Sequence, residues 1–497
     1  MENGERGPGS MSADDQPRVS PETGSAGASG AAIPLMPVAA ASAAHAAAAR
    51  YDAPYRLFLV TSLALALFGG FLLAVLLPLA QTLDWSWGLR WQALVQAHGQ
   101  LQLLGFAGLF VMGMSLRLMP RFSGIELPSA SLVRALIPLI ATSVILRSVA
   151  QPWASGALRD AALIASAALL VAGALAFATL IWGTVLRRNS RAEATGWYFS
   201  LGALAYVAQS LLNAAIVIEI VRRDLEVAPL AKDEALVFLQ LFGFILLFLA
   251  GVSTRAVPAL TGHPRPDAPS RVTALVFASA VAVYTAAALW AAYETPSVAT
   301  ARVEDTALIV IAAAFVAITW LSGVFRPRAN RVAAASQFSF FFVRAAFAWI
   351  IIAAALITWY ALGALPDGRV LDSFETDAVR HALTLGVVTM MIIGVALLVV
   401  PEFAGRRLQH PGERLIGYAM LIGLNATVVL RVWPATEGLD WLGTTRFWPM
   451  AVAGLIAIGV VAAFTFMFVQ SYIEQRPKGW ASPQALKART RPDGRSE

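Results

Sequence analysis

Long uninterrupted blocks of apolar residues constrain this chain more than any other feature. Blocks such as Leu57 to Leu79, Ala161 to Leu186 and Ala451 to Val469 reach the roughly 20 residues that a helix needs to cross about 30 Å of hydrocarbon. Backbone N–H and C=O groups find no water there, so such blocks are expected to be helical. The chain is 58% hydrophobic and only 13% charged, whereas about a quarter of the residues of a soluble domain are charged. These features predict an all-α integral membrane protein.

The apolar blocks predict about twelve transmembrane helices in a membrane domain at residues 51–475. The expected spans lie near 55–80, 97–119, 131–151, 160–186, 196–220, 234–257, 271–293, 306–325, 338–363, 377–400, 415–434 and 447–473. Residues 1–50 are rich in Ala, Gly, Ser and Pro and lack helical periodicity, so we expect a disordered cytoplasmic tail. Residues 476–497 are expected to form a basic cytoplasmic tail.

Charged residues distinguish the two sets of alternating loops. One set is rich in arginine: Arg121, Arg187, Arg188, Arg191, Arg265, Arg271, Arg326, Arg328, Arg331, Arg406, Arg407 and Arg414. The other set has fewer cations, often offset by acids such as Asp224, Glu234 and Asp377. Because cytoplasmic loops are enriched in Lys and Arg, the first set and both termini are expected in the cytoplasm. The net charge of +7 is therefore explained mostly by topology, and no nucleic-acid partner is expected.

A pattern of glycine and proline occurs three times, in the second, sixth and tenth expected spans. Its copies are Gly105, Gly113, Pro120 and Gly124; Gly243, Gly251, Pro258 and Gly262; and Gly386, Gly394, Pro401 and Gly405. Small residues let membrane helices pack closely, but packing alone does not explain a period of four spans. The repeat predicts three four-helix units, arranged with pseudo-threefold symmetry, and each proline at the cytoplasmic end of its helix.

The chain has five histidines and no cysteine, so disulfides, iron–sulfur clusters and c-type haem attachment are excluded. His45 lies in the tail, while His263 and His410 lie in Arg- and Pro-rich loops, where a solvated role is expected. His98 and His381 lie at the outer starts of two repeat helices. Ionisable residues within membrane spans are costly and are usually functional.

His98 and His381 could face each other across the helix bundle and ligate one haem iron. The alternative is that both are hydrogen-bonded residues at helix interfaces. His98 lies 22 residues before Pro120 and His381 lies 20 before Pro401. That offset is about 3 Å along a helix and about 200° around it, so strict symmetry would not aim both rings at one point. Spacing alone leaves both interpretations open.

The segments HGQLQLLGFAGLFVMGMSLRLMPRFSG, from His98, and HALTLGVVTMMIIGVALLVVPEFAGR, from His381, resemble the NnrS family of haem-containing membrane proteins. NnrS proteins are similar in turn to subunit I of the haem–copper oxidases, which has twelve helices in three arcs of four. The resemblance covers roughly residues 55–473. It implies a multi-pass protein of the bacterial inner (cytoplasmic) membrane with an oxidase-like fold.

The resemblance also implies how a haem site would be built. In the oxidases, a histidine of the second span and the second His of a His-x-His in the tenth span hold the low-spin haem. His98, followed by Gly99, and His381 match these positions. Val379 replaces the histidine of the oxygen-reducing haem, and the seventh span has no histidine for a copper centre. The resemblance therefore implies one b-type haem with two histidine ligands. Gln100 stands where many relatives have a second histidine, so copper is doubtful here.

Arg147 and Arg431 close the third and eleventh spans at the outer side. They are candidate partners of haem propionates, with snorkelling to lipid headgroups as the alternative. NnrS members are associated with haem, copper and tolerance of nitric oxide stress. Together these features predict a haem protein in electron transfer or the nitric oxide response, with a quinol or a cytochrome as electron donor. The alternative is a transporter, structural or assembly protein that keeps the fold without redox chemistry. No catalytic residue is assigned.

Overall fold

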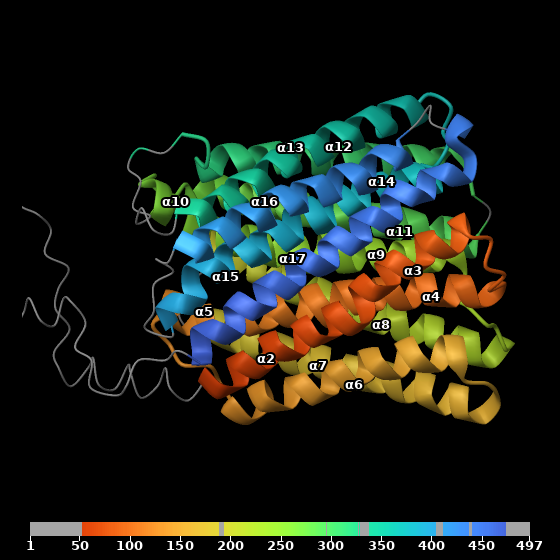
Figure 1. The fold of residues 1–497 in the computed structure, drawn as a ribbon, viewed down its shortest axis with the longest axis horizontal. Coiled ribbons are helices and arrows are strands. Elements are labelled where there is room, and N and C mark those ends of the chain that lie inside the picture. The colour runs from red at the N-terminus through yellow and green to blue at the C-terminus, as the bar shows by residue number, and fades with distance from the viewer. Residues whose placement is uncertain are drawn as a thin grey trace, which may run out of the picture. The chain divides into compact units, whose positions relative to one another are not determined.

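The computed structural model describes residues 52–187, 193–294, 296–326, 328, 337–403, 411–436 and 440–473. Every regular element in these ranges is a helix, and twelve helices are long and apolar enough to span a membrane (Figure 1). The all-helical fold with twelve spans is therefore confirmed. The expected tails at 1–50 and 476–497, with His45, and also His410 and Gly405, lie outside the described residues.

Four of the spans are interrupted by a π-helical segment, marked η. The first span is α2 (Asp52–Leu65), η1 (Ala66–Gly70) and α3 (Phe71–Thr82); the second is α4 (Leu89–Gln100), η2 (Leu101–Gly108) and α5 (Leu109–Ser123); the sixth is α9 (Leu230–Phe238), η4 (Leu239–Ile245) and α10 (Leu246–Thr261); the tenth is α14 (Ser373–Leu383), η6 (Thr384–Thr389) and α15 (Met390–Phe403). The other spans are continuous: α6 (Ala130–Trp153), α7 (Gly156–Arg187), α8 (Ala194–Arg223), α11 (Asp267–Tyr293), α12 (Val298–Ser322), α13 (Gln337–Ala364), α16 (Pro411–Val432) and α17 (Phe447–Ile473). The short 3₁₀ helices η7 (Trp433–Ala435) and η8 (Asp440–Arg446) lie between the last two spans.

Several helices begin further out than their apolar blocks predict. The second span starts at Leu89 and the eighth at Val298, rather than near 97 and 306. The added turns carry polar residues such as Arg90 and Arg302, which lower local hydropathy without breaking the helix. The eighth span begins with a capping box in which Ser297 and Thr300 satisfy each other's backbone N–H. Hydropathy therefore locates the part that spans the hydrocarbon, and in the eighth span the capping box marks where the helix begins.

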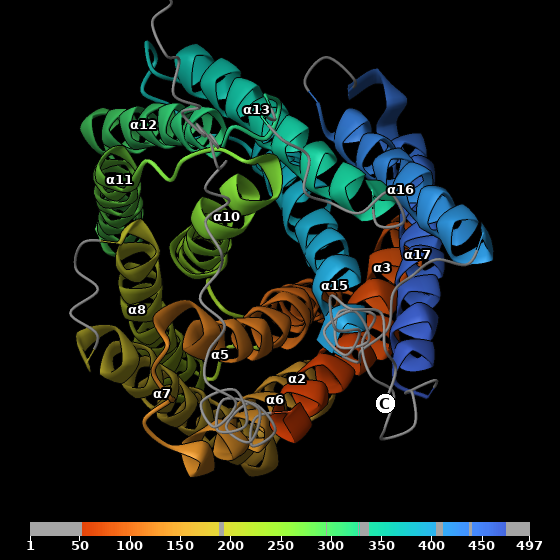
Figure 2. The same ribbon diagram turned by 90° about the vertical axis from the view of Figure 1, so that its left-hand side faces the viewer.

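The three repeat helices form the centre of the membrane domain. In an end-on view, α5, α10 and α15 lie inside a ring made by the other spans (Figure 2). In the most apolar stretch of the second, sixth and tenth spans, 94%, 83% and 72% of the residues are buried, whereas the share is 56% or less in the other nine. The helices that share the repeat are thus the ones that face protein rather than lipid.

Each copy of the repeat also keeps the same local structure. A π segment surrounds its first glycine, and the second glycine packs against an aromatic residue from the first span of its own unit. A Cβ added at this second glycine would lie within 2.6–2.8 Å of that aromatic side chain; the pairs are Gly113 with Phe58, Gly251 with Phe199 and Gly394 with Phe342. The repeat prolines lie in the last turns of α5, α10 and α15, as the sequence predicts.

Candidate functional site

The two histidines of interest lie in the last turns of α4 and α14, the helices that open the second and tenth spans. Each histidine lies three residues before a π segment, and Pro120 and Pro401 each lie eleven residues after the start of the α-helix that follows this segment. The segment η2 has 8 residues and η6 has 6. The two histidines differ by two residues in their distance from the repeat proline, and this difference equals the difference in length between η2 and η6. Turns of a π-helix have i→i+5 hydrogen bonds and hold more residues than turns of an α-helix. His98 consequently lies in electrostatic range of His381, Asp377 and Arg431.

The ring of His98 is oriented by the first span. Its Nδ1 atom lies 2.9 Å from the carbonyl oxygen of Gly70, so Nδ1 carries the proton and donates it. Gly70 ends the π segment η1, and Cβ atoms added at Gly69 and Gly70 would lie 3.0 Å from Leu101 and 2.7 Å from Gln102, respectively. This pair of glycines thus lets the first span approach the second closely enough for the bond to form.

The helix that carries His381 is fixed at its start by a capping box. Asp372 accepts hydrogen bonds from the backbone N–H groups of Phe374 (2.7 Å) and Glu375 (2.8 Å). Glu375 in turn accepts from the N–H of Asp372 at 2.8 Å, and Arg369 donates to both Glu375 carboxylate oxygens at 2.7 Å. Capping of this kind stabilises a helix start, so α14 has a defined first turn two turns before His381.

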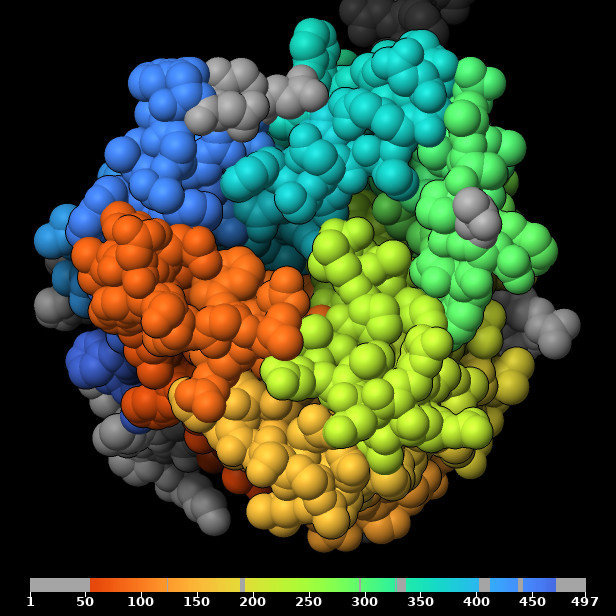
Figure 3. All heavy atoms as spheres, turned by 90° about the vertical axis from the view of Figure 1, so that its right-hand side faces the viewer, coloured from red at the N-terminus to blue at the C-terminus, as the bar shows by residue number. Residues whose placement is uncertain are grey.

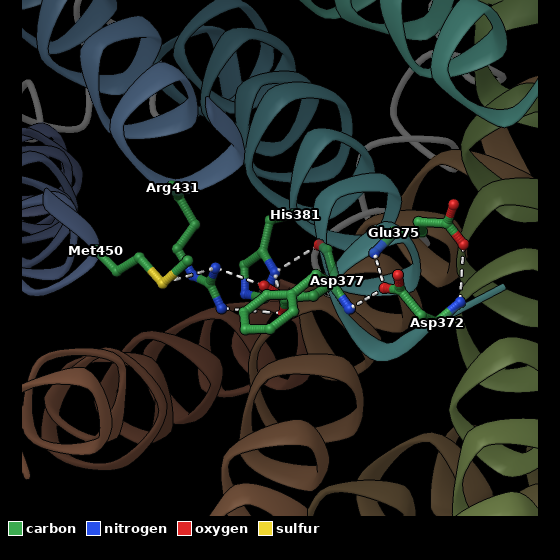
Figure 4. A network of polar contacts seen from close by, with 7 residues as sticks. Asp372, Glu375, Asp377, His381, Arg431 and Met450 are labelled. Atoms are coloured by element: carbon green, nitrogen blue, oxygen red, sulfur yellow. Dashed lines mark hydrogen bonds and ion pairs between the residues drawn. The ribbon is translucent and has the colours of Figure 1, made fainter. Parts of the chain in front are cut away.

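His381 belongs to a partly buried chain of charged side chains with Asp377 and Arg431 (Figure 4). Its Nδ1 donates to the carbonyl oxygen of Asp377 at 2.9 Å and lies 3.0 Å from the Asp377 carboxylate. Arg431, on α16, donates to both oxygens of that carboxylate at 2.5 and 2.9 Å. It also donates to the Met450 sulfur, on α17, at 3.4 Å. A bidentate arginine holds the carboxylate in place, and the carboxylate holds the imidazole ring.

Both histidines therefore can offer the same atom, Nε2, to a metal ion. In each ring Nδ1 is a donor to oxygen, so Nε2 carries the lone pair. Neither Nε2 atom has a hydrogen-bond partner among the residues that the structure describes. The His381 side chain keeps 20% of its surface accessible, so its ring is not sealed by packing. A histidine whose second nitrogen donates to a carbonyl or carboxylate is the usual form of a metal-ligating histidine. The donor set fits an iron porphyrin held from two sides.

Arg147 lies in a different polar network from Arg431. Arg147 is 2% exposed, and it donates to Gln151 at 3.4 Å and to Asn213. Gln151 bonds Gln96 on α4. Gln96 and His98 are two residues apart and so about 200° apart around α4, which places Arg147 and His98 on opposite sides of that helix. The structure thus brings His98, His381 and Arg431 together, and Arg147 as a propionate partner stays a prediction.

Two site residues carry no signal in the apolar pattern. In the sequence Asp377 is simply an acidic residue of an outer loop, although a carboxylate four residues before a histidine shares its helix face. Gly70 is one of many glycines in apolar spans.

Two further residues lie at opposite ends of the domain. Arg446 is 5% exposed, and its guanidinium lies 4.4 Å from the ring centroid of Phe374 on α14. It adds a further cation at the end of the domain where α14 begins. His263 is at the other end of the domain, where its ring bonds the carbonyl of Arg326.

The chain matches a known family and is similar to solved structures. The family described as NnrS protein matches residues 32–476. No curated protein is significantly similar in sequence. Among solved structures, a haem–copper terminal oxidase dimer, studied by cryo-EM for insight into its catalytic mechanism, is similar with a TM-score of 0.63. The similarity covers 88% of this chain and 90% of that one at 12% identity, which shows a shared fold.

Proposed function

Because this chain belongs to the NnrS family, we propose that it holds one b-type haem between His98 and His381 and serves in electron transfer or the nitric oxide response. The oxidase-like fold supports a haem membrane protein. The observation that carries the proposal is the state of the two rings: each donates through Nδ1 to a fixed oxygen atom and has Nε2 without a partner among the described residues. We further propose that the site lacks an oxygen-reducing haem–copper centre, since Val379 stands where the resemblance to the oxidases places its histidine.

A haem bound in this way would supply a one-electron couple. The protein residues would supply its orientation and its electrostatics. Gly70 and Asp377 fix the two ring planes, and Asp377 makes the His381 ring a stronger electron donor. Arg431 holds Asp377 and is the proposed partner of a propionate on the same side. An iron with two histidine ligands has no open position, so nitric oxide would bind only after one ligand leaves, whereas electron transfer needs no such step.

The proposed electron donor is a quinol or a cytochrome, and the proposed location is the bacterial inner membrane with both termini in the cytoplasm. This orientation places both histidines towards the outer side. Segments near residues 90, 230 and 370 lie next to one another at the centre of that face, and other parts of the chain surround them (Figure 3). The helix that carries His98 begins at this face, as does the helix that carries His381.

Reduced-minus-oxidised spectra of the detergent-purified protein, expressed with ample haem, test the proposal. The parent is expected to show a sharp b-type α band, and His98→Ala and His381→Ala are each expected to lose or shift it. His263→Ala is the matched control, because His263 is at the opposite end of the domain, where its ring bonds the Arg326 carbonyl; it should keep the parent spectrum.

Two results would contradict the proposal. Folded parent protein without haem would favour the transporter or structural alternative. Full haem content in both histidine variants would place the haem elsewhere in the protein. Titration of the reduced parent with nitric oxide then separates the two proposed roles, because a spectral change requires that the iron exchange a ligand.

A further inference from the structure

A second polar cluster lies beneath the loop that joins α8 to α9. The loop residue Ala228 exchanges two hydrogen bonds with the side chain of Gln96, at 2.9 and 3.0 Å. Gln151 donates to Gln96 at 2.5 Å, and Arg147 donates to Gln151 at 3.4 Å. Arg147 Nη1 also donates to Asn213 Oδ1 on α8. The hydrogen bonds thus run inward from the loop to Asn213, through side chains that are at most 8% exposed.

Two donors at the inner end of this cluster have no acceptor. Arg147 Nη2 and Asn213 Nδ2 are buried and form no hydrogen bond within the described part of the chain. They lie close together, since the two side chains bond each other through their other atoms. Guanidinium and amide nitrogens only donate, so the missing group is an acceptor. A buried donor without a partner costs roughly 1–3 kcal/mol, and more when it is charged.

The charge of Arg147 narrows the choice of acceptor. A guanidinium stays protonated in proteins, and a buried charge requires a counter-charge. Asp233 interacts electrostatically with Arg147 without bonding it, and it interacts with Arg380 as well. No described carboxylate forms an ion pair with Arg147. A negatively charged acceptor would satisfy the open hydrogen bonds and also give Arg147 a direct ion pair, whereas a water molecule would satisfy only the hydrogen bonds.

We propose that Arg147 and Asn213 bind a small monovalent inorganic anion, of the class of chloride, nitrite or nitrate. Gln96 and Gln151 are buried and bonded to each other and to the α8–α9 loop above the open donors, which favours a small anion over a large organic one. A haem propionate is the other source of such an acceptor. His98 lies on the opposite side of α4 from this cluster, so a free anion is favoured over a propionate.

Equilibrium dialysis of the haem-loaded protein against ³⁶Cl⁻ tests the proposal directly. The parent is expected to bind about one chloride saturably, displaced by nitrite or nitrate. Asn213→Asp keeps the side-chain shape, removes the orphan donor and supplies a fixed negative charge beside Arg147. It should therefore weaken chloride binding at least about tenfold, or about 1.4 kcal/mol. Arg302→Gln is the control, because Arg302 is exposed and bonds the carbonyls of Leu365 and Pro366; it should bind chloride as the parent does.

Thermal unfolding provides a readout that does not depend on tight binding. Chloride in place of gluconate should raise the unfolding temperature of the parent, while Asn213→Asp should be stable without chloride and insensitive to it. Equal chloride dependence of both proteins would overturn the proposal, as would the absence of any chloride effect on the parent, which indicates bound water. Chloride binding only to haem-free protein, with an altered haem spectrum in Asn213→Asp, would also overturn it and assign the acceptor to a propionate.

Discussion

The two candidate haem ligands differ at the residue scale in what holds their Nδ1 atoms. His98 donates to a neutral carbonyl, that of Gly70. His381 donates towards a carboxylate, Asp377, which is itself held by Arg431. A carboxylate partner gives an imidazole more anionic character, which favours ferric over ferrous iron. The pair of ligands is therefore electronically unequal, and Asp377 is the residue through which the protein would set the potential of the haem.

Asp377→Asn is expected to raise the haem midpoint potential. The amide still accepts a hydrogen bond but lacks the negative charge that stabilises the ferric state, so the shift should be positive and on the order of tens of millivolts. Spectroelectrochemical titration of the parent and the variant measures it. Asp367→Asn, which removes an exposed charge from the same side of the domain, should leave the potential near that of the parent. An unchanged potential in Asp377→Asn would show that Asp377 does not act on a haem ligand.

At this scale the sequence indicates ligands better than their partners. His98 and His381 could be selected because histidines are few and ionisable groups in spans are costly. Asp377 could not be assigned from composition, because an acid at an outer helix end is also what topology predicts. The partner of Arg147 depends on which side of α4 faces α6, and no local pattern encodes that. The offset between the histidines had a local cause, the unequal π segments η2 and η6, that apolar periodicity does not reveal.

At the scale of helices, the glycine and proline repeat identifies the second, sixth and tenth spans as helices with the same structural role. Glycines at its second position let the first span of each unit pack an aromatic ring against the inner helix. Twelve spans could be predicted because lipid demands apolar blocks of defined length. Their outer ends could not, since turns that contain Arg90 or Arg302 leave the hydrocarbon while remaining helical. The interior position of the repeat helices follows from contacts between distant spans, which a single sequence does not show.

Gly251→Ala is expected to destabilise the protein, although alanine is the better helix former. The added Cβ would lie 2.8 Å from the Phe199 ring and 2.9 Å from Tyr198, and overpacking of this kind costs typically about 1–3 kcal/mol. Gly459→Ala is the matched control in α17, because nothing lies within 4 Å of a Cβ there. The unfolding temperature in one detergent should fall for Gly251→Ala and stay the same or rise for Gly459→Ala. Equal behaviour would mean that the repeat glycine does not serve close packing.

At the scale of the whole molecule, the orientation in the membrane decides what the site can do. Twelve antiparallel spans place the loops before α4 and α14 at one end of the domain and those after α5 and α15 at the other (Figure 1). Arginines such as Arg121, Arg265 and Arg326 lie at the second end. The positive-inside rule assigns that end to the cytoplasm and thereby places the two histidines towards the opposite side.

Cysteine labelling tests this orientation cleanly, because the chain has no cysteine of its own. Ser86→Cys lies in the exposed loop before α4, and Ala268→Cys lies at the exposed start of α11 between Arg265 and Arg271. In intact spheroplasts a membrane-impermeant maleimide should label Ser86→Cys and not Ala268→Cys, while both should react after the membrane is opened. The reverse pattern would place the histidines towards the cytoplasm. A donor from the outer side would then have to pass electrons across most of the membrane to reach them, which would favour a cytoplasmic donor instead.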